Sequence, residues 1–228
     1  MEVLGHRRTH RDFIETPVPL DHLSMILSQT WGPQRFIDAE LFETQQLRSS
    51  PSAGGRHEVE CYVAVLNVDG IRAGLYHYNS RLHALELLNP SFDRDAVGRV
   101  TYGQRQCTGA AFTCFTTARI RRLSWKYRHP RAYRLVMYDA GHYGQTFALV
   151  ATALGLGPFQ TAAFLDSAVE KALGVSLDEE FPVYVLGAGY PRPTKNPLLP
   201  SDYKYPKLSV RGSERGTAGE RPPPGPSR

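Results

Sequence analysis

The sequence predicts an α+β fold in which helices pack against a mostly antiparallel sheet. Helix-like and strand-like segments interleave along the chain, but without the regular β-α alternation of a doubly wound sheet. The chain has 228 residues, of which 41% are hydrophobic and 21% charged. This balance is typical of a globular protein, and the length allows an ample buried core.

Three segments have the spacing of amphipathic helices. Residues 21–31 repeat apolar side chains three and four positions apart and are followed by Gly32. Residues 166–173 have a similar pattern and are closed by Gly174. The strongest helical pattern is that of residues 141–156, with one face formed by Phe147, Val150, Ala151 and Leu154.

Strands are predicted where β-branched and aromatic residues gather in short runs bounded by turn residues. Two of these runs, residues 75–78 and 83–88, flank Asn79-Ser80-Arg81, which indicates a hairpin. The predicted strands are residues 60–68, 75–78, 83–88, 112–120 and 182–187.

Two regions are predicted along the chain, a folded domain at 1–205 and a disordered tail at 206–228. The tail is rich in Pro, Gly and Arg and almost free of large apolar residues. Such a segment buries too little surface to offset the entropy lost on ordering.

Several classes of protein are disfavoured. No stretch approaches the roughly 18 consecutive apolar residues of a membrane-spanning helix, and the N-terminus lacks the apolar region of a secretory signal. The three cysteines have neither disulfide-framework nor zinc spacing, so we expect a reducing, cytoplasmic setting. The net charge is +5, and four Arg and two Glu in residues 209–228 supply part of it. The remainder is too small to indicate nucleic-acid binding.

A basic segment near the N-terminus is a candidate phosphate site. Arg7, Arg8, Thr9 and Arg11 offer guanidinium and hydroxyl donors, which bind phosphate through charge-assisted hydrogen bonds. The alternative is a solvated basic N-terminus. Nearby histidines lack a third ligand, so no metal site is expected.

Pro51, Ser52, Ala53 and Gly54 form a candidate ligand-binding turn. Small residues let backbone N–H groups approach a flat or anionic ligand closely. The alternative is a plain turn between two elements. The segment lacks the G-K-[ST] ending of a Walker loop, and no G-x-G-x-x-G follows a strand elsewhere.

Lys126 and Tyr127 are a candidate proton-handling pair. An ammonium close to a phenol stabilises the phenolate, which can then serve as a general base. The alternative is an exposed lysine beside a packed tyrosine. The chain has no G-x-S-x-G and no H-E-x-x-H motif. A bound cofactor is therefore expected to carry the reaction.

Six segments, taken in order, resemble the FMN-dependent nitroreductase fold and, within it, the SagB-type dehydrogenases that oxidise azolines. The resemblance covers roughly residues 5–195. Its segments are R-R-T-H-R-D-F, P-S-A-G-G-R-H-E-V-E, G-L-Y-H-Y, K-Y-R-H-P-R-A-Y-R with the following D-A-G-H-Y-G-Q, F-L-D-S-A-V-E-K-A-L-G-V, and V-L-G-A-G-Y-P.

The resemblance implies that FMN binds at a homodimer interface. Arg7, Arg8, Thr9 and Arg11 would then hold the phosphate and ribityl chain, and Pro51 to Gly54 would reach the flavin from the partner subunit. The other implied contacts are Gln145, Ala162, Ala163 and one basic residue, Arg192 or Lys195. Lys126 and Tyr127 match the catalytic pair of azoline dehydrogenases.

The chain departs from the family pattern in three places. Thr9 stands where serine is usual, residues 57–59 lack the usual proline, and Ala162-Ala163 replaces a pair that commonly contains glycine.

The function implied is oxidation of thiazoline or oxazoline rings to thiazole or oxazole, on a peptide or carrier-bound substrate. A cyclodehydratase or synthetase would be a further partner. The alternatives are a generic NAD(P)H-dependent nitro- or flavin-reductase and a non-catalytic scaffold subunit of a peptide-modifying complex.

Overall fold

The computed structural model describes residues 2–39 and 44–193. The chain divides into two units, Met1–Arg192 and Pro193–Arg228, and the first is described here. The predicted domain boundary at residue 205, and the tail after it, lie outside the described residues and remain predictions.

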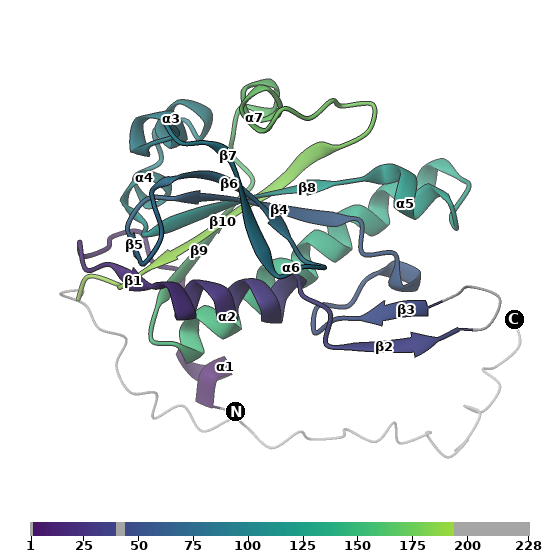
Figure 1. Ribbon diagram of the computed structural model, residues 1–228, viewed down its shortest axis with the longest axis horizontal. Coiled ribbons are helices and arrows are strands. Elements are labelled where there is room, and N and C mark those ends of the chain that lie inside the picture. The colour runs from purple at the N-terminus through teal and green to yellow at the C-terminus, as the bar shows by residue number, and fades with distance from the viewer. Residues whose placement is uncertain (1, 40–43, 194–228) are drawn as a thin grey trace, which may run out of the picture. The chain divides into compact units, whose positions relative to one another are not determined.

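A six-stranded sheet forms the centre of the first unit (Figure 1). Its strand order is β7-β6-β4-β8-β10-β9, and every neighbouring pair is antiparallel. The predicted α+β class with a mostly antiparallel sheet is therefore confirmed. The strands are β4 (Val59–Val65), β6 (Gly74–Asn79), β7 (Ala84–Asn89), β8 (Phe112–Ala118), β9 (Gly157–Thr161) and β10 (Phe181–Gly189).

Helices cover both faces of this sheet (Figure 1). One face packs against α2 (Leu20–Trp31) and α6 (Tyr133–Ala153), and the other against α3 (Arg94–Val100), α4 (Arg105–Gly109) and α7 (Asp166–Leu173). Two short helices, α1 (Glu2–His6) and α5 (Ile120–Ser124), and two 3-10 turns, η2 (Ala53–Gly55) and η3 (Pro130–Ala132), lie outside these layers. Two small pairs of strands complete the list: β1 (Val18–Pro19) pairs with β5 (Val68–Asp69), and β2 (Arg35–Asp38) pairs with β3 (Thr44–Leu47).

The side chains of β4 point alternately into two hydrophobic cores, one on each face of the sheet. Cys61, Val63 and Val65 face the core shared with α2 and α6, whereas Tyr62 and Ala64 face the other core. No helix of the described ranges combines the length and hydropathy needed to span a bilayer.

Helix α6 packs against β9, β10 and β4 and carries residues of both regions of the candidate site. Its buried residues recur three and four positions apart, as expected for one face of a helix. They are Val136, Asp139, Ala140, Tyr143, Gly144, Phe147, Ala148 and Ala151. Asp139 is the charged member of this otherwise apolar and small-residue face.

The structure corrects several predicted boundaries. The central helix begins at Tyr133 rather than at residue 141, and it ends at Ala153, before the left-handed Gly155 (φ 75°). The strand predicted at 60–68 is interrupted after Val65, and the strand predicted at 112–120 ends at Ala118, where α5 soon begins. The predicted helix at 166–173 and the hairpin of β6 and β7 are present.

Strand β9 was missed because Gly157 and Pro158 look like a helix terminator. A proline is tolerated on an edge strand, where no partner needs its N–H. β9 is the edge next to β10, and the carbonyl of Pro158 accepts a hydrogen bond from His10 N at 2.9 Å. The N-terminal basic segment is thereby attached to this edge.

Candidate active site

The turn at residues 51–54 packs directly against Lys126 and Tyr127. Gly54 has a left-handed backbone, with φ 59°. A Cβ at this position would lie 2.8 Å from both Lys126 Nζ and Tyr127 Oη. Because real Cβ atoms do not approach other atoms so closely, only glycine fits there without displacing the pair.

The Lys-Tyr pair is held at the end of α5. The backbone N–H groups of Lys126 and Tyr127 both donate to the carbonyl of the fully buried Leu123, at 3.1 and 3.0 Å. Lys126 Nζ lies 5.8 Å from the centroid of the Tyr127 ring. Lys126 is exposed, whereas Tyr127 is half-buried and packs with Ala53 against a small apolar cluster. The phenol is therefore fixed while the ammonium reaches solvent.

A cavity of about 360 Å³ opens beside Tyr127. The aromatic rings of Tyr127 and His129 lie 6.5 Å apart and line it together with Tyr133. The cavity therefore lies next to the candidate general base.

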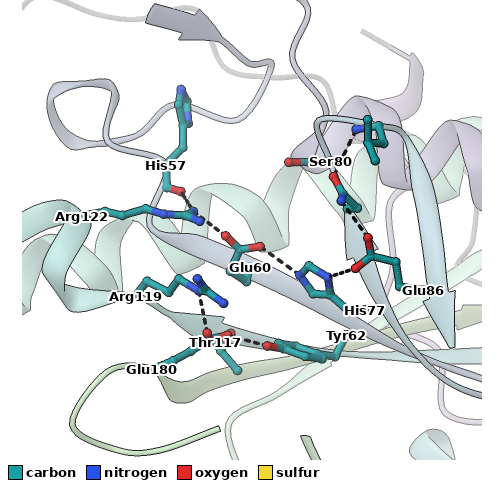
Figure 2. Close-up of polar contacts among 12 residues, drawn as sticks. His57, Glu60, Tyr62, His77, Ser80, Glu86, Thr117, Arg119, Arg122 and Glu180 are labelled. Atoms are coloured by element: carbon teal, nitrogen blue, oxygen red, sulfur yellow. Dashed lines mark hydrogen bonds and ion pairs between the residues drawn. The ribbon is translucent and has the colours of Figure 1, made fainter. Parts of the chain in front are cut away.

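Two further contacts join α5 to the turn. The Arg56 guanidinium lies 5.0 Å from the centroid of the Trp125 ring, and its Nε donates to the Gly54 carbonyl at 3.1 Å. Arg122 Nη1 donates to the carbonyl of His57 at 3.0 Å (Figure 2). The turn and the Lys-Tyr pair therefore form one connected unit.

Arg122 is in turn fixed by an ion-pair network on the sheet (Figure 2). It pairs with Glu60, which also bonds His77 Nε2 at 3.3 Å, and His77 Nδ1 lies 3.0 Å from Glu86. Burial alone would raise the pKa of Glu60, but the His77 hydrogen bond and the Arg122 charge outweigh it and lower the pKa to about 2. Glu60 is thus a permanent anion that anchors Arg122.

Two buried carboxyl groups lie beneath the turn. Asp139 Oδ2 accepts a hydrogen bond from the backbone N–H of Ala53 at 2.7 Å, and Glu58 Oε2 accepts one from Ser52 Oγ at 3.3 Å. Their exposed fractions are 2% and 0%. Burial, followed by the neighbouring Asp139 carboxylate, raises the pKa of Glu58 to about 7.

His57 supports the same turn from the side of α6. Its Nδ1 lies 3.2 Å from Tyr143 Oη, and its Nε2 lies 3.0 Å from the Gln46 carbonyl. Burial and the positive charge of Arg48 lower the pKa of His57 to about 4, so the ring is neutral at physiological pH. Arg48 Nη1 also donates to Tyr143 Oη at 3.3 Å.

A second region brings together residues that are far apart in sequence. A cavity of about 260 Å³ is lined by Arg7, Arg8 and Thr9 of the N-terminal segment and by Gln145 of α6. His10 anchors the segment: its ring packs so closely on Gly157 that a Cβ there would lie 2.7 Å from His10 Cγ. Four predicted cofactor contacts thus share one cavity.

Among the described residues, the other predicted cofactor contacts do not line this cavity. Arg11 is exposed and does not line this cavity. Arg192 lies beside the N-terminal segment, with Nη2 donating to the Phe13 carbonyl at 3.2 Å. Ala162 and Ala163 are exposed and follow the end of β9, whose residues 158–160 line the cavity. Lys195 lies outside the described residues.

The two regions lie at different places along α6. Asp139 supports the turn, whereas Ala148 lines the basic cavity. Nine residues of helix separate them, or roughly 13 Å at 1.5 Å per residue. One chain therefore presents guanidinium donors and a glycine-containing turn at separate positions.

These two regions have the donor chemistry that FMN requires. Guanidinium and hydroxyl groups suit its phosphate, and small residues let a backbone turn approach a flat ring closely. The fold and the site together fit a flavin-dependent oxidoreductase.

A larger cavity, of about 580 Å³, contains none of the predicted site residues. Its walls include Arg119 and Glu180, which bond each other at 2.7 Å, and Tyr62, whose hydroxyl donates to Glu180 at 2.9 Å (Figure 2). Because these charges are paired with one another, the network has the character of a structural support for β4, β8 and β10.

Sequence reasoning missed Glu58, Asp139 and Arg122. Asp139 could have been found from its place in the apolar stripe of α6, where a charge needs a buried partner. Glu58 and Arg122 had no such local signal, because their contacts join segments distant in sequence.

The chain belongs to the nitroreductase family, whose family model matches residues 4–190. It is 30% identical over 167 residues to the trifolitoxin-processing protein TfxB of Rhizobium leguminosarum bv. trifolii, covering 70% of this chain and 45% of TfxB. The predicted membership of this family is confirmed.

Two solved structures are similar. A putative nitroreductase from Anabaena variabilis ATCC 29413 has a TM-score of 0.70 and 30% identity, over 84% of this chain and 38% of that one. A chain of the E. coli microcin synthetase McbBCD complex, with truncated pro-MccB17 bound, has a TM-score of 0.65 and 23% identity, over 80% of this chain and 68% of that one. The present chain thus spans less than half the length of TfxB and of the Anabaena protein.

Proposed function

We propose that this protein is an FMN-dependent dehydrogenase that oxidises thiazoline or oxazoline rings to thiazole or oxazole. The substrate would be a peptide or a carrier-bound intermediate, as in the SagB-type branch of the family. The observation that carries the proposal is the contact between Gly54 and the pair Lys126 and Tyr127. It brings a candidate general base to the turn that would face the flavin.

Arg7, Arg8 and Thr9 would hold the FMN phosphate, with Gln145 contacting the cofactor from α6. Bound FMN would accept the hydride that leaves the azoline ring, and dioxygen would be the final oxidant. Arg11, Ala162, Ala163, Arg192 and Lys195 are proposed as further contacts.

Tyr127 would take the proton from the ring carbon next to the substrate carbonyl. The acceptor atom would be Tyr127 Oη, and the Lys126 ammonium lies 5.8 Å from the centroid of its ring. Because Lys126 is exposed, the proton can leave Tyr127 for solvent after each turnover. Loss of a proton and a hydride leaves the ring with one more double bond, which makes it aromatic.

The separation of the two regions along α6 supports a homodimeric site. If each flavin is held by the basic cavity of one copy and by the turn of residues 51–54 of the other, both sets can meet one ligand. Exposed apolar residues on the outer face of α6, Met137 and Tyr138, provide a surface that a second copy could cover.

The relatives support the substrate class and a further partner. TfxB is named for processing trifolitoxin, and McbBCD is a microcin synthetase complex with truncated pro-MccB17 bound. We propose that this chain works with a cyclodehydratase or synthetase that forms the azoline.

The likeness to the Anabaena putative nitroreductase favours a second candidate, a generic NAD(P)H-dependent nitro- or flavin-reductase. Such an enzyme would consume NAD(P)H with nitroaromatic substrates and would not need Lys126 or Tyr127. A non-catalytic scaffold would keep its pathway working when both are replaced.

The test has two stages. The purified protein should show the absorption bands of oxidised flavin, or gain them with added FMN, and should convert an azoline peptide to the azole. Tyr127→Phe and Lys126→Ala should lose turnover by about 10²–10⁴-fold while keeping the flavin bands. Tyr102→Phe and Lys171→Ala, at exposed positions away from the turn, serve as matched controls. A colourless protein that binds no FMN would contradict the proposal.

A further inference from the structure

Glu58 occupies an unusual position for an acidic residue. Its side chain is fully buried directly behind the turn, and among the described residues Oε1 has no hydrogen-bond donor. Besides a hydrogen bond from its own backbone N–H, the carboxyl group receives the Ser52 hydroxyl, which itself accepts a hydrogen bond from His57 N at 2.8 Å. A buried carboxylate with so few donors is costly, whereas a neutral carboxylic acid is not.

The neighbour within hydrogen-bonding reach of Glu58 is another acceptor, Asp139. Two carboxyl groups can bond each other only if one of them carries a proton. Asp139 already receives the Ala53 N–H at 2.7 Å and has His142 Nδ1 at 3.7 Å from Oδ1. Asp139 is therefore the better-supported anion, and the proton belongs on Glu58.

The cations around the pair are engaged elsewhere. Arg48 bonds Tyr143, Gln46 and Ser80. Arg56 bonds the Gly54 carbonyl and Gln45. Arg122 bonds Glu60 and the His57 carbonyl.

The other titratable groups that face the pair form no hydrogen bond to Glu58. From α6, His142 and Tyr143 are its titratable neighbours, and from its own segment His57 is held neutral by burial. None of the hydrogen bonds and ion pairs of the described residues gives Glu58 a cationic partner that would stabilise its ionised form.

We infer that Glu58 is a positioning residue whose neutral carboxyl group donates a hydrogen bond to Asp139, and that this proton-sharing pair fixes the Ala53–Gly54 backbone against Lys126 and Tyr127. The inference rests on the proposed function only in taking this turn as the flavin-facing surface. Glu58 lies in the segment 57–59, where the family pattern has a proline.

Loss of the shared proton would place two negative charges side by side in a dry environment. Asp139 would then be repelled from Glu58 while still holding the Ala53 N–H, and the turn would shift. Gly54 has no free space toward Lys126 and Tyr127, so even a small shift changes their geometry. Cofactor affinity and proton abstraction should both weaken as pH rises.

The first experiment compares wild type with Glu58→Gln, whose amide donates to Asp139 but does not titrate. FMN affinity is measured by fluorescence titration on either side of pH about 7. Wild-type affinity should fall several-fold on the alkaline side, and Glu58→Gln should not show this fall. Glu15→Gln, at an exposed carboxylate outside the site and its supporting networks, should behave as wild type. Equal pH dependence of FMN affinity in wild type and Glu58→Gln would overturn the inference. Disappearance of the alkaline fall in His142→Gln would overturn it too, because His142 would then be the titrating group.

A positioning role also predicts how catalysis responds. Glu58→Gln should leave KM for the azoline peptide near the wild-type value and should remove the alkaline decrease of kcat. Asp139→Asn, which removes the second charge, should flatten the same profile. A uniform loss of activity at every pH in both variants would contradict a proton-linked role.

A third measurement needs neither FMN nor activity. The infrared spectrum of the apo wild-type protein near neutral pH should contain the carbonyl band of a protonated carboxylic acid, and Glu58→Gln should lack it. Absence of the band in wild type overturns the inference even if the variant fails to fold. If the band is present and no FMN binds, the proposed function fails while the proton-sharing pair stands.

Discussion

Gly54 and Tyr127 are separated by less space than a methyl group needs. A Cβ on Gly54 would lie 2.8 Å from the phenol oxygen, and the same distance from Lys126 Nζ. Residues that are more than seventy positions apart in sequence therefore meet without a gap. The placement of a candidate base depends on the conformation of one glycine.

Gly54→Ala should lower azoline turnover by about 10²-fold, because it displaces Lys126 and Tyr127 and also strains a left-handed backbone. Steady-state kinetics with an azoline peptide would measure the loss. Gly55→Ala is the matched control: it has the same kind of backbone, with φ 65°, but open space around its Cβ. Equal losses in the two variants would show that backbone strain, rather than displacement of the pair, is responsible.

Arg7→Ala should weaken FMN binding by about 10–100-fold, the effect of losing one charge-assisted hydrogen bond to a phosphate. Equilibrium titration followed by flavin fluorescence would measure it. Arg11→Ala removes the same charge from a residue that does not line the cavity, so its effect should be smaller. A larger effect at Arg11 would mean that the phosphate lies outside this cavity.

Acidification should destabilise the protein through His57. Its folded-state pKa of about 4 is below the ordinary value of 6.5, so the unfolded chain binds a proton that the folded protein excludes. His57 should therefore lower the free energy of unfolding by on the order of 3 kcal/mol as pH falls from 6.5 to 4. Because Glu58 makes an opposite contribution of similar size, this change is measured in the Glu58→Gln background. Urea unfolding over this range would measure the slope.

In the Glu58→Gln background, His57→Gln should flatten that slope, whereas His129→Gln, at an exposed position, should leave it unchanged. Glu58 contributes with the opposite sign. Its pKa is raised on folding from 4.5 to about 7, so stability is lost as pH rises across this window. Each variant must therefore be compared with Glu58→Gln alone at the same pH.

Arg122→Gln should destabilise the protein by on the order of 2 kcal/mol, since Glu60 loses its guanidinium partner and the His57 carbonyl loses a donor. Arg121→Gln is the control, because the ion pair of Arg121 with Glu179 is longer, at 3.6 Å, and both of its side chains are exposed. Urea denaturation would compare them. If both variants unfold at the same urea concentration, the contacts of Arg122 with Glu60 and the His57 carbonyl do not stabilise the protein.

Periodicity predicted the elements whose pattern is purely apolar. Helices α2 and α7 and the hairpin of β6 and β7 appear where the sequence indicates them. The first two turns of α6 were missed because Tyr133 and Tyr138 are exposed and Asp139 interrupts the apolar pattern. β9 was missed because Gly157 and Pro158 read locally as a helix stop, and only pairing with β10 makes them a strand.

The candidate site was predictable in part. The residues of its two regions came from a resemblance between short segments, since nothing local indicates that Arg7 and Gln145 share a cavity. Neither the local sequence nor the resemblance predicted that Glu58 and Asp139 belong to the site. Their importance comes from burial and mutual proximity, which appear only once α6 lies beneath the turn.

Helix α6 acts as a spacer of fixed length between the two regions that each copy contributes to the proposed cofactor sites. Asp139 and Ala148 are joined by a continuous rod, and neither end can move along its axis without the other. Inserting one residue between them would rotate the distal half by about 100° and lengthen the rod by about 1.5 Å. The molecule thus tolerates change in its loops far more readily than any change in the length of this helix.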